Sequence, residues 1–297
     1  MRKDRLKTIS QCGREITVQE INDIKEMIVL CKGLSRRELV ETVSENLEWF
    51  TASGSNKIDA CAKLLDKLES NKIIELPPKV TKKKYKKKAI CKTEKTAPQP
   101  DIICELKDLG EIKLEIVKDK IIKDLWNEYV FRYHYLGYKK PFGYTLRYFI
   151  RSDQGLLGCF LFSGASRAIG ARDRWIGWTE KQRLNNLAWV INNSRFLIFP
   201  WVNVKNLASN VLGSVTRQIR RDWQEKWNYS PVLLETFVDP LYYKGSCYKA
   251  SNWVYLGRTT GQGLVRKGKT YTTSPKEIFV KPLTKSFRKV LCSDKSK

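Results

Sequence analysis

The first 70 residues alternate apolar and polar positions with the spacing of three short helices. Thr17 with Glu20, and Ser35 with Glu38, form two capping boxes, the pattern that marks the N-terminus of a helix. The apolar residues of each segment recur every three or four positions, so they share one helical face. They are Ile21, Ile24 and Ile28 in the first segment, Leu39, Val43 and Leu47 in the second, and Ile58, Cys61, Leu64, Leu65 and Leu68 in the third.

A short apolar run at residues 73–76 follows the third helix and predicts a strand that ends before Pro77 and Pro78. Three helices followed by a strand are typical of a winged helix, in which the third helix enters the major groove of DNA. The polar face of that helix would present Lys57, Lys63, Lys67 and Lys72. A protein-docking or dimerising module fits the same pattern, and the zero net charge of residues 1–78 favours it.

From residue 111 the pattern changes to strands that alternate with helices. We expect strands at 111–117, 144–151, 155–163, 194–199, 232–238 and 253–256, helices at 119–132, 178–191 and 204–227, and a turn or short helix at 248–252. This order is typical of an α/β (α+β) chain with a mixed sheet. The expected domains are a winged-helix-like module over 1–78, a Lys-rich linker over 79–110, and an α/β domain with a basic C-terminal tail over 111–297.

Positive charge is in large excess and unevenly spread. The chain holds 56 Lys and Arg against 31 Asp and Glu, a net charge of +25. Residues 79–95 carry nine lysines against Glu94, and residues 262–297 carry ten basic residues against two acidic ones. Such a surplus favours a phosphate-rich partner, DNA or RNA, although a solvated tether explains the linker equally well. The candidate phosphate contacts are Lys82, Lys83, Lys84, Lys86, Lys87, Lys88, Arg258 and Arg266.

Neither a membrane nor a metal is indicated by the composition. We find no apolar run long enough to cross a bilayer and no basic amphipathic helix of the membrane-surface type. Residues 1–5 are not followed by the apolar region of a signal peptide, so we expect a cytoplasmic chain without a membrane partner. The eight cysteines are scattered and there is one histidine, so we expect reduced thiols and no structural zinc.

Two aromatic-rich segments are candidates for chemistry. His134 lies in YHYLGY just after a predicted helix and is a candidate general base, although a structural histidine at a helix end fits equally. In ARDRWIGW, Arg172, Arg174 and Trp178 are suited to gripping a phosphate and stacking a base. The alternative for this second segment is an Arg–Asp pair that fixes a loop, with the tryptophans in the core.

Carboxylates at the end of the predicted strand 232–238 are a further candidate site. Strand alternation places Glu235 and Asp239 on one face, where they could hold Mg²⁺ for phosphodiester cleavage with Asp173 as a third ligand. They could equally accept a proton from an amine nucleophile, or form salt bridges to arginines. Tyr248 is a candidate proton donor in the following segment, although packing in an aromatic core explains it as well.

Several long motifs resemble the DruA family of the Druantia anti-phage systems, whose relatives also occur beside transposases. They are GREITVQEI (13–21), IIELPP (73–78), YHYLGY (133–138), ARDRWIGW (171–178), NNSRFLIFPWVNVKNLAS (192–209), LLETFVDP (233–240) and YKGSCYKASNWVYLGRTTGQG (243–263). The resemblance implies a role in bacterial defence or mobile-element biology, beside partner proteins that include a helicase-like component. It supplies no catalytic residues.

The order of elements from residue 194 onward is also similar to the core of the acyl-CoA-dependent N-acetyltransferase fold. In that fold the turn before the long helix offers backbone N–H groups to a pyrophosphate. This chain has Phe199-Pro200-Trp201-Val202-Asn203 in place of a glycine-rich turn, and Pro200 removes one donor. If Trp201 fills the space at this turn, a CoA-type ligand is excluded.

Three functions therefore compete. The leading one is a nucleic-acid-binding component of a defence system, which engages DNA mainly through backbone phosphates and docks partner proteins. An enzyme on nucleic acid is the alternative: either a base-modifying transferase with a CoA-type ligand, or a nuclease with Mg²⁺ at Glu235 and Asp239. A scaffold that feeds DNA to a helicase is the third.

Overall fold

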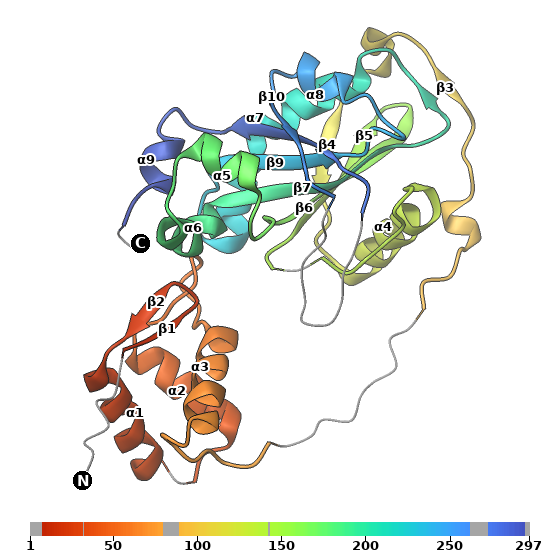
Figure 1. The fold of residues 1–297 in the computed structure, drawn as a ribbon. Coiled ribbons are helices and arrows are strands. Elements are labelled where there is room, and N and C mark those ends of the chain that lie inside the picture. The colour runs from red at the N-terminus through yellow and green to blue at the C-terminus, as the bar shows by residue number, and fades with distance from the viewer. Residues whose placement is uncertain (1–7, 32, 80–88, 142, 262–272, 295–297) are drawn as a thin grey trace. The chain divides into compact units, whose positions relative to one another are not determined.

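The computed structural model describes residues 8–31, 33–79, 89–141, 143–261 and 273–294 (Figure 1). The chain divides into two compact units. The smaller unit comprises residues 1–87 with 180–185 and 294–297, and the larger one comprises residues 88–179 with 186–293.

The smaller unit is a hairpin followed by three helices. Strands β1 and β2 pair antiparallel around a turn in which both Cys12 and Gly13 have positive φ. Both predicted capping boxes are present, at the starts of the first and second helices. The apolar faces expected from the sequence form one buried core. The elements are β1 (Ile9–Gln11), β2 (Arg14–Ile16), α1 (Val18–Leu30), α2 (Arg36–Asn46) and α3 (Ile58–Ser70).

The strand predicted at residues 73–76 is wrong: this segment follows α3 without β pairing. Ile73 and Ile74 pack against the helical core, and the Leu76 N–H donates to a carboxylate oxygen of Glu69 at 3.3 Å. The Leu76 N–H thus donates to a side-chain carboxylate instead of to the backbone of a neighbouring strand. The hairpin of this unit precedes the helices instead of following them, so the winged-helix assignment is not confirmed.

The larger unit is built on a seven-stranded mixed sheet with the order β10-β11-β9-β7-β6-β5-β4. Five of the six pairs of neighbouring strands are antiparallel, and the exception is the parallel pair of β7 with β9 in the middle. The predicted mixed-sheet α/β class is confirmed. The strands are β4 (Lys113–Ile116), β5 (Leu146–Ser152), β6 (Gly155–Gly164), β7 (Val190–Ile198), β9 (Leu233–Val238), β10 (Val254–Arg258) and β11 (Glu277–Pro282).

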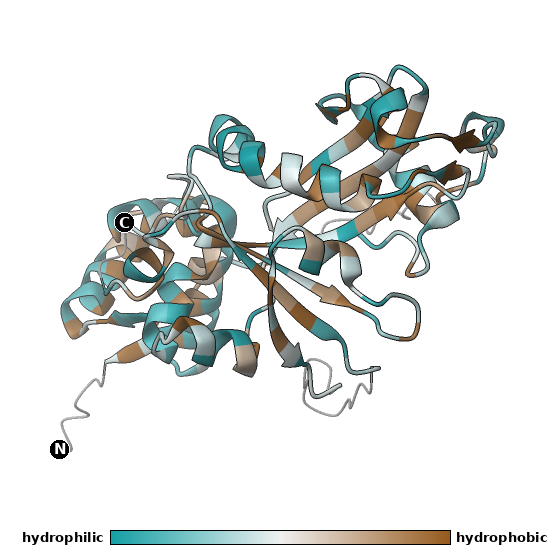
Figure 2. Ribbon diagram, turned by 90° about the horizontal axis from the view of Figure 1, so that it is seen from above, coloured by the Kyte–Doolittle hydropathy of each residue, from teal (hydrophilic) through white to brown (hydrophobic). Residues whose placement is uncertain are grey.

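Helices α4 (Lys120–Tyr133) and α7 (Leu207–Trp227) cover opposite faces of this sheet. The Tyr148 hydroxyl on β5 donates to Asp222 of α7, whereas the ring of its neighbour Phe149 contacts Tyr129 of α4. Because successive strand side chains point to opposite faces, the two helices lie on opposite sides. Hydrophobic residues are concentrated in the strands of the sheet, and the outer loops are largely hydrophilic (Figure 2). Within the described residues, no helix is long and apolar enough to cross a membrane.

Part of the predicted linker is folded onto the larger unit. Thr96, at the end of the 3-10 helix η1 (Glu94–Thr96), donates its hydroxyl to the buried Glu128 carboxylate at 2.6 Å. Strand β3 (Ile102–Ile103) pairs parallel with β8 (Val202–Asn203), and the 3-10 helix η2 (Leu106–Leu109) follows. Residues 89–110 therefore extend the larger unit instead of acting as a tether.

The remaining elements differ from the expected ones in three places. The predicted helix 178–191 stops at α6 (Glu180–Asn186), and after the 3-10 helix η3 (Leu187–Trp189) the chain enters β7. Helix α5 (Gly170–Ile176) was not expected. The basic tail contains β11, which fills the sheet between β9 and β10, and α9 (Phe287–Leu291). Helix α8 (Ser246–Ala250) and strand β10 agree with the prediction.

Candidate functional site

A cavity of about 260 Å³ opens where β7 and β9 separate. These strands pair only from Val190 to Asn192 with Leu233 to Glu235, and beyond that point β7 continues along β6 and β9 along β11. The register of β7 against β6 also shifts between Asn193 and Arg195, which is typical of a β-bulge. The walls are His134, Tyr135, Leu136, Asn193, Ser194, Arg195, Phe196, Leu197, Ile198, Ala208, Thr236, Phe237, Val238, Asp239, Tyr243, Lys244, Gly245, Ser246, Cys247 and Tyr248.

The structure brings together three of the five catalytic candidates. His134, Asp239 and Tyr248 come from the end of α4, the end of β9 and α8, and all three line this cavity. Glu235 and Asp173 do not line it and belong to a separate buried network. The predicted shared face of Glu235 and Asp239 therefore does not give a shared site.

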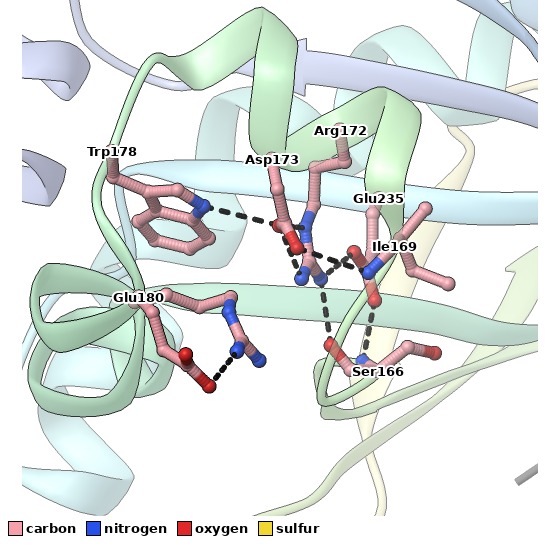
Figure 3. A network of polar contacts seen from close by, with 8 residues as sticks. Ser166, Ile169, Arg172, Asp173, Trp178, Glu180 and Glu235 are labelled. Carbon is pink, nitrogen blue, oxygen red and sulfur yellow. Dashed lines mark hydrogen bonds and ion pairs between the residues drawn. The ribbon is translucent and has the colours of Figure 1, made fainter. Parts of the chain in front are cut away.

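Arg172 is the centre of that buried network (Figure 3). Its guanidinium donates to Glu235 Oε2 at 2.6 Å, to Asp173 Oδ1 at 2.8 and 2.9 Å, and to the Ser166 carbonyl at 2.8 Å. The indole N–H of Trp178 donates to the same Asp173 oxygen at 3.1 Å. The network joins the loop before α5 to the central strand β9.

Glu235 has no oxygen left for a metal or a substrate. Burial raises the pKa of Glu235, while the Arg172 guanidinium and the Ser166 N–H, which lies 2.7 Å from Oε1, oppose that rise. Both carboxylate oxygens are thus engaged inside the protein. Arg172 and Glu235 are fully buried and Trp178 is nearly so, which places the predicted phosphate and base contacts Arg172 and Trp178 in the interior.

Asp239 also has its own cation. Its Oδ2 accepts from Lys276 Nζ at 2.7 Å and from the Ser274 hydroxyl at 2.9 Å, and its Oδ1 accepts from the Leu241 N–H at 3.2 Å. Burial alone would raise the pKa of Asp239, but these hydrogen bonds outweigh it and lower the pKa. No group of three or more His, Cys, Asp or Glu side chains in the described part of the chain is arranged to hold a metal ion. The Mg²⁺ alternative therefore lacks a pair of unengaged carboxylates.

His134 is a neutral hydrogen-bonding group in this arrangement. It ends α4, and its Nδ1 accepts from the Leu136 N–H at 3.2 Å, so the ring proton is on Nε2. Burial, followed by the nearby Arg195, lowers the pKa of His134 to about 4. A group with this pKa is a weak base at neutral pH and is better suited to donating a hydrogen bond.

Asn193, Arg195 and Thr236 are among the polar cavity residues that were not selected as candidates from the sequence. Asn193 Nδ2 donates to the Tyr248 hydroxyl at 3.2 Å, and the Thr236 hydroxyl donates to the Asn193 carbonyl at 3.0 Å. Burial raises the pKa of Tyr248, which keeps its hydroxyl protonated. The signal that could have found Asn193 and Arg195 is the polar run Asn192 to Arg195 inside an otherwise apolar strand.

Trp201 does not line the cavity. Its ring lies 4.9 Å from Phe199 and 5.1 Å from Tyr133, in an aromatic cluster beside α4. Trp201 therefore does not fill the space between β7 and β9.

The remaining nucleic-acid candidates are distributed over both units. Lys63 and Lys67 are exposed on α3, whereas Lys57 is half-buried and burial lowers its pKa. Arg174 is exposed on α5, and the exposed Arg258 lies 3.5 Å from Glu277. Outside the described residues lie Lys82, Lys83, Lys84, Lys86, Lys87, Lys88 and Arg266.

A protein-family model matches most of the chain. The model described as Druantia protein DruA matches residues 67–272. No curated protein matches the chain.

Solved structures similar to the chain include several acetyltransferases. A spermidine N-acetyltransferase SpeG chimera from Vibrio cholerae and hSSAT is 10% identical, with a TM-score of 0.35, over 59% of this chain and 96% of that one. A probable GNAT-family acetyltransferase from Chromobacterium violaceum is 11% identical, with a TM-score of 0.34, over 70% and 97%. FeeM, an N-acyl amino acid synthase from uncultured soil microbes, is 11% identical, with a TM-score of 0.34, over 58% and 90%. No conclusion about activity rests on this loose likeness.

Proposed function

The chain belongs to the DruA family, and from that premise we propose that it is a nucleic-acid-binding component of the Druantia anti-phage system, which engages DNA mainly through its phosphates and works in the cytoplasm. The net charge of +25 supports a polyanionic partner. The proposal assigns phosphate binding to the larger unit and to the lysines of residues 79–95.

A group of exposed lysines around the cavity carries this proposal. Lys139 and Lys140 follow the lining segment 134–136, Lys205 precedes Ala208, Lys244 lines the cavity, and Lys249 lies within α8. None of these five lysines forms an ion pair with a carboxylate within the described residues. Lysines without acidic partners, on segments that also contribute lining residues to the cavity, are suited to phosphates that approach it from outside.

The experiment is a binding titration at several salt concentrations. The full chain is titrated into fluorescently labelled DNA, and the logarithm of the association constant is plotted against the logarithm of salt concentration. Affinity should fall more than tenfold between about 50 and 200 mM salt, because each neutralised phosphate releases condensed counterions. A flat response, or no binding at the lowest salt, would refute the proposal.

The smaller unit supports the second part of the proposal, the docking of partner proteins. Residues 1–78 have no net charge, and Val29 and Leu30 at the end of α1 are 61% and 82% exposed. Val29 lines a groove of about 450 Å³, together with apolar side chains such as Ile28 and Leu39. Exposed apolar surface of this kind marks contact sites for other proteins.

Docking is tested by co-purification with the helicase-like component of the same system. The wild-type chain should retain that component without DNA, and Val29→Ser with Leu30→Ser should release it. The Lys63→Gln and Lys67→Gln variant provides the control, because it removes charge from α3 and leaves the groove intact. Equal retention by all three chains would count against docking through this unit.

One observation favours the alternative of a base-modifying transferase. His134, Asp239 and Tyr248 line one cavity, and Tyr248 holds a hydroxyl that could supply a proton to a leaving group. If this activity exists, incubation with acyl-CoA and DNA should add the acyl mass to a nucleoside, and Tyr248→Phe should abolish the product. Digested DNA without any modified nucleoside would remove this alternative.

A further inference from the structure

The cavity between β7 and β9 contains a cation without an anionic partner. Arg195 lines it, and the Arg195 guanidinium donates to the carbonyls of Ser194 at 2.5 Å and Gly137 at 3.3 Å. Arg195 is half-buried, so its guanidinium has lost part of its hydration, and this burial lowers the pKa of Arg195. None of the carboxylates in the described residues forms an ion pair with it. A desolvated cation of this kind is stabilised when an anion enters the site.

The same cavity contains a buried hydrogen-bond acceptor without a donor. Asn193 is 3% exposed and lines the wall, and its Oδ1 has no hydrogen-bond partner within the described residues. The orientation of the Asn193 amide is fixed by the hydrogen bond that its Nδ2 donates to the Tyr248 hydroxyl. An unpartnered buried acceptor costs about 1–3 kcal/mol, so a ligand that supplies an N–H donor there is favoured.

Exposed aromatic rings lie at the mouth. Tyr242 and Tyr243 follow β9 and are 62% and 51% exposed. Their ring centroids lie 4.6 Å and 5.7 Å from that of Tyr135, which in turn stacks on His134 at 4.9 Å. Tyr135, Tyr243 and His134 all line the cavity. Exposed aromatic faces beside a basic groove are the surfaces on which single-stranded bases stack.

We propose that this cavity takes one unpaired nucleotide of a single-stranded nucleic acid, a ligand class that deepens the proposed function and rests on it. The base enters with its exocyclic amino group toward Asn193 Oδ1, its phosphate lies on Arg195, and neighbouring bases stack on Tyr242 and Tyr243. The volume of about 260 Å³ is below the range of about 300–1,000 Å³ typical of sites for larger ligands, and suits a single planar ring.

Duplex DNA cannot deliver such a nucleotide without losing a base pair. Unpairing and unstacking cost a few kcal/mol, and this cost is absent in a strand that is already single. The site therefore prefers single strands, and the acceptor on Asn193 prefers a base with an amino group. Cytosine carries N4–H₂ where thymine carries the O4 acceptor, so these two pyrimidines form a matched pair for the test.

The experiment measures binding of the full chain to labelled oligo-dC, oligo-dT and a duplex of mixed sequence at one salt concentration. Wild-type protein should bind oligo-dC about tenfold more tightly than oligo-dT, and both more tightly than the duplex. Asn193→Leu should bring oligo-dC down to the affinity of oligo-dT. Tyr242→Ala with Tyr243→Ala should weaken both single strands about tenfold or more and leave the duplex unchanged.

Tyr255→Ala is the matched control. Tyr255 is 46% exposed on β10 but does not line the cavity, so this variant should bind every probe as the wild type does. The tyrosine variants change only exposed rings, and they keep the test valid if Asn193→Leu fails to fold.

The outcomes separate this inference from the proposed function. If the wild type binds no probe, both the proposed function and the nucleotide site are refuted. If it binds with steep salt dependence but equally to single strands and duplex, or if the tyrosine variant matches the wild type, only the nucleotide site falls. Competition with free cytidine monophosphate and with CoA tests whether the cavity binds a nucleotide of a nucleic-acid strand or a nucleotide-containing cofactor. Displacement of oligo-dC by CoA at a lower concentration than by cytidine monophosphate would overturn the inference in favour of a cofactor site.

Discussion

Arg172 and Glu235 form a fully buried ion pair, with Nη1 of the arginine 2.6 Å from Oε2 of the glutamate. The pair joins α5 to the central strand β9, directly beside the point where β7 and β9 separate. It holds the wall of the cavity without facing the cavity, because neither residue is among its lining. Two of the most conspicuous charged residues of the sequence thus have a structural role that positions the site.

Removal of one member of this pair should destabilise the fold strongly. Arg172→Met leaves Glu235 buried without its cation, and breaking such a pair costs about 3–5 kcal/mol. Arg174→Met on the same helix is the control, because Arg174 is exposed and its loss should change stability by less than about 0.5 kcal/mol. Urea denaturation of both variants measures the difference. Equal midpoints for Arg172→Met and the wild type would show that the network is not what fixes this region.

His134 makes a defined contribution to the pH dependence of stability. Its pKa is about 4 in the folded chain and about 6.5 when unfolded, so between these values the unfolded state binds more protons. Stability from this residue is therefore present above pH 6.5 and is lost as the pH falls through 4, by about 3 kcal/mol in total.

The measurement compares thermal unfolding of the wild type and His134→Asn at pH 4.5, 5.5 and 7. Asparagine can still accept the Leu136 N–H but does not titrate, and the chain has no other histidine. The wild type should lose more stability than the variant on acidification, since the carboxylates contribute equally to both. Parallel pH curves would contradict a neutral, half-buried His134.

The lysines of residues 79–95 should contribute affinity without specificity. Lys82, Lys83 and Lys84 lie outside the described residues, and their density in the sequence indicates loose phosphate contacts. Changing all three to Gln should weaken binding to every sequence alike and make the salt slope shallower by about 2. Lys107→Gln, which removes a lysine already paired with Glu105, is the control. An unchanged slope in the triple variant would place the phosphate contacts elsewhere.

The sequence predicted elements well where local signals are strong. The capping boxes at Thr17 and Ser35 begin α1 and α2 as expected, because side chain and backbone satisfy each other within four residues. The long helix α7 and strand β9 agree with their apolar periods. Strand β11 was missed, because Lys276 and Lys281 frame its short apolar run and its pairing partners are distant in the chain.

The site was harder to predict than the fold. The strand end that carries Asp239 was identified correctly, but Glu235 was expected to face the same way, and its partner Arg172 lies 63 residues away in the sequence. Asn193 and Arg195 were not selected, because their importance arises from the parting of β7 and β9. That parting depends on which strands pair with β6 and β11, and no local pattern encodes it.

The most direct test of nucleotide binding at this cavity is photocrosslinking. A single-stranded DNA that carries one 5-iododeoxycytidine is irradiated with the full chain, and the crosslinked peptides are identified by mass spectrometry. We expect crosslinks at Tyr242, Tyr243 or Tyr135, the rings at the mouth of the cavity. Crosslinks confined to residues 79–95 or to the smaller unit would contradict it.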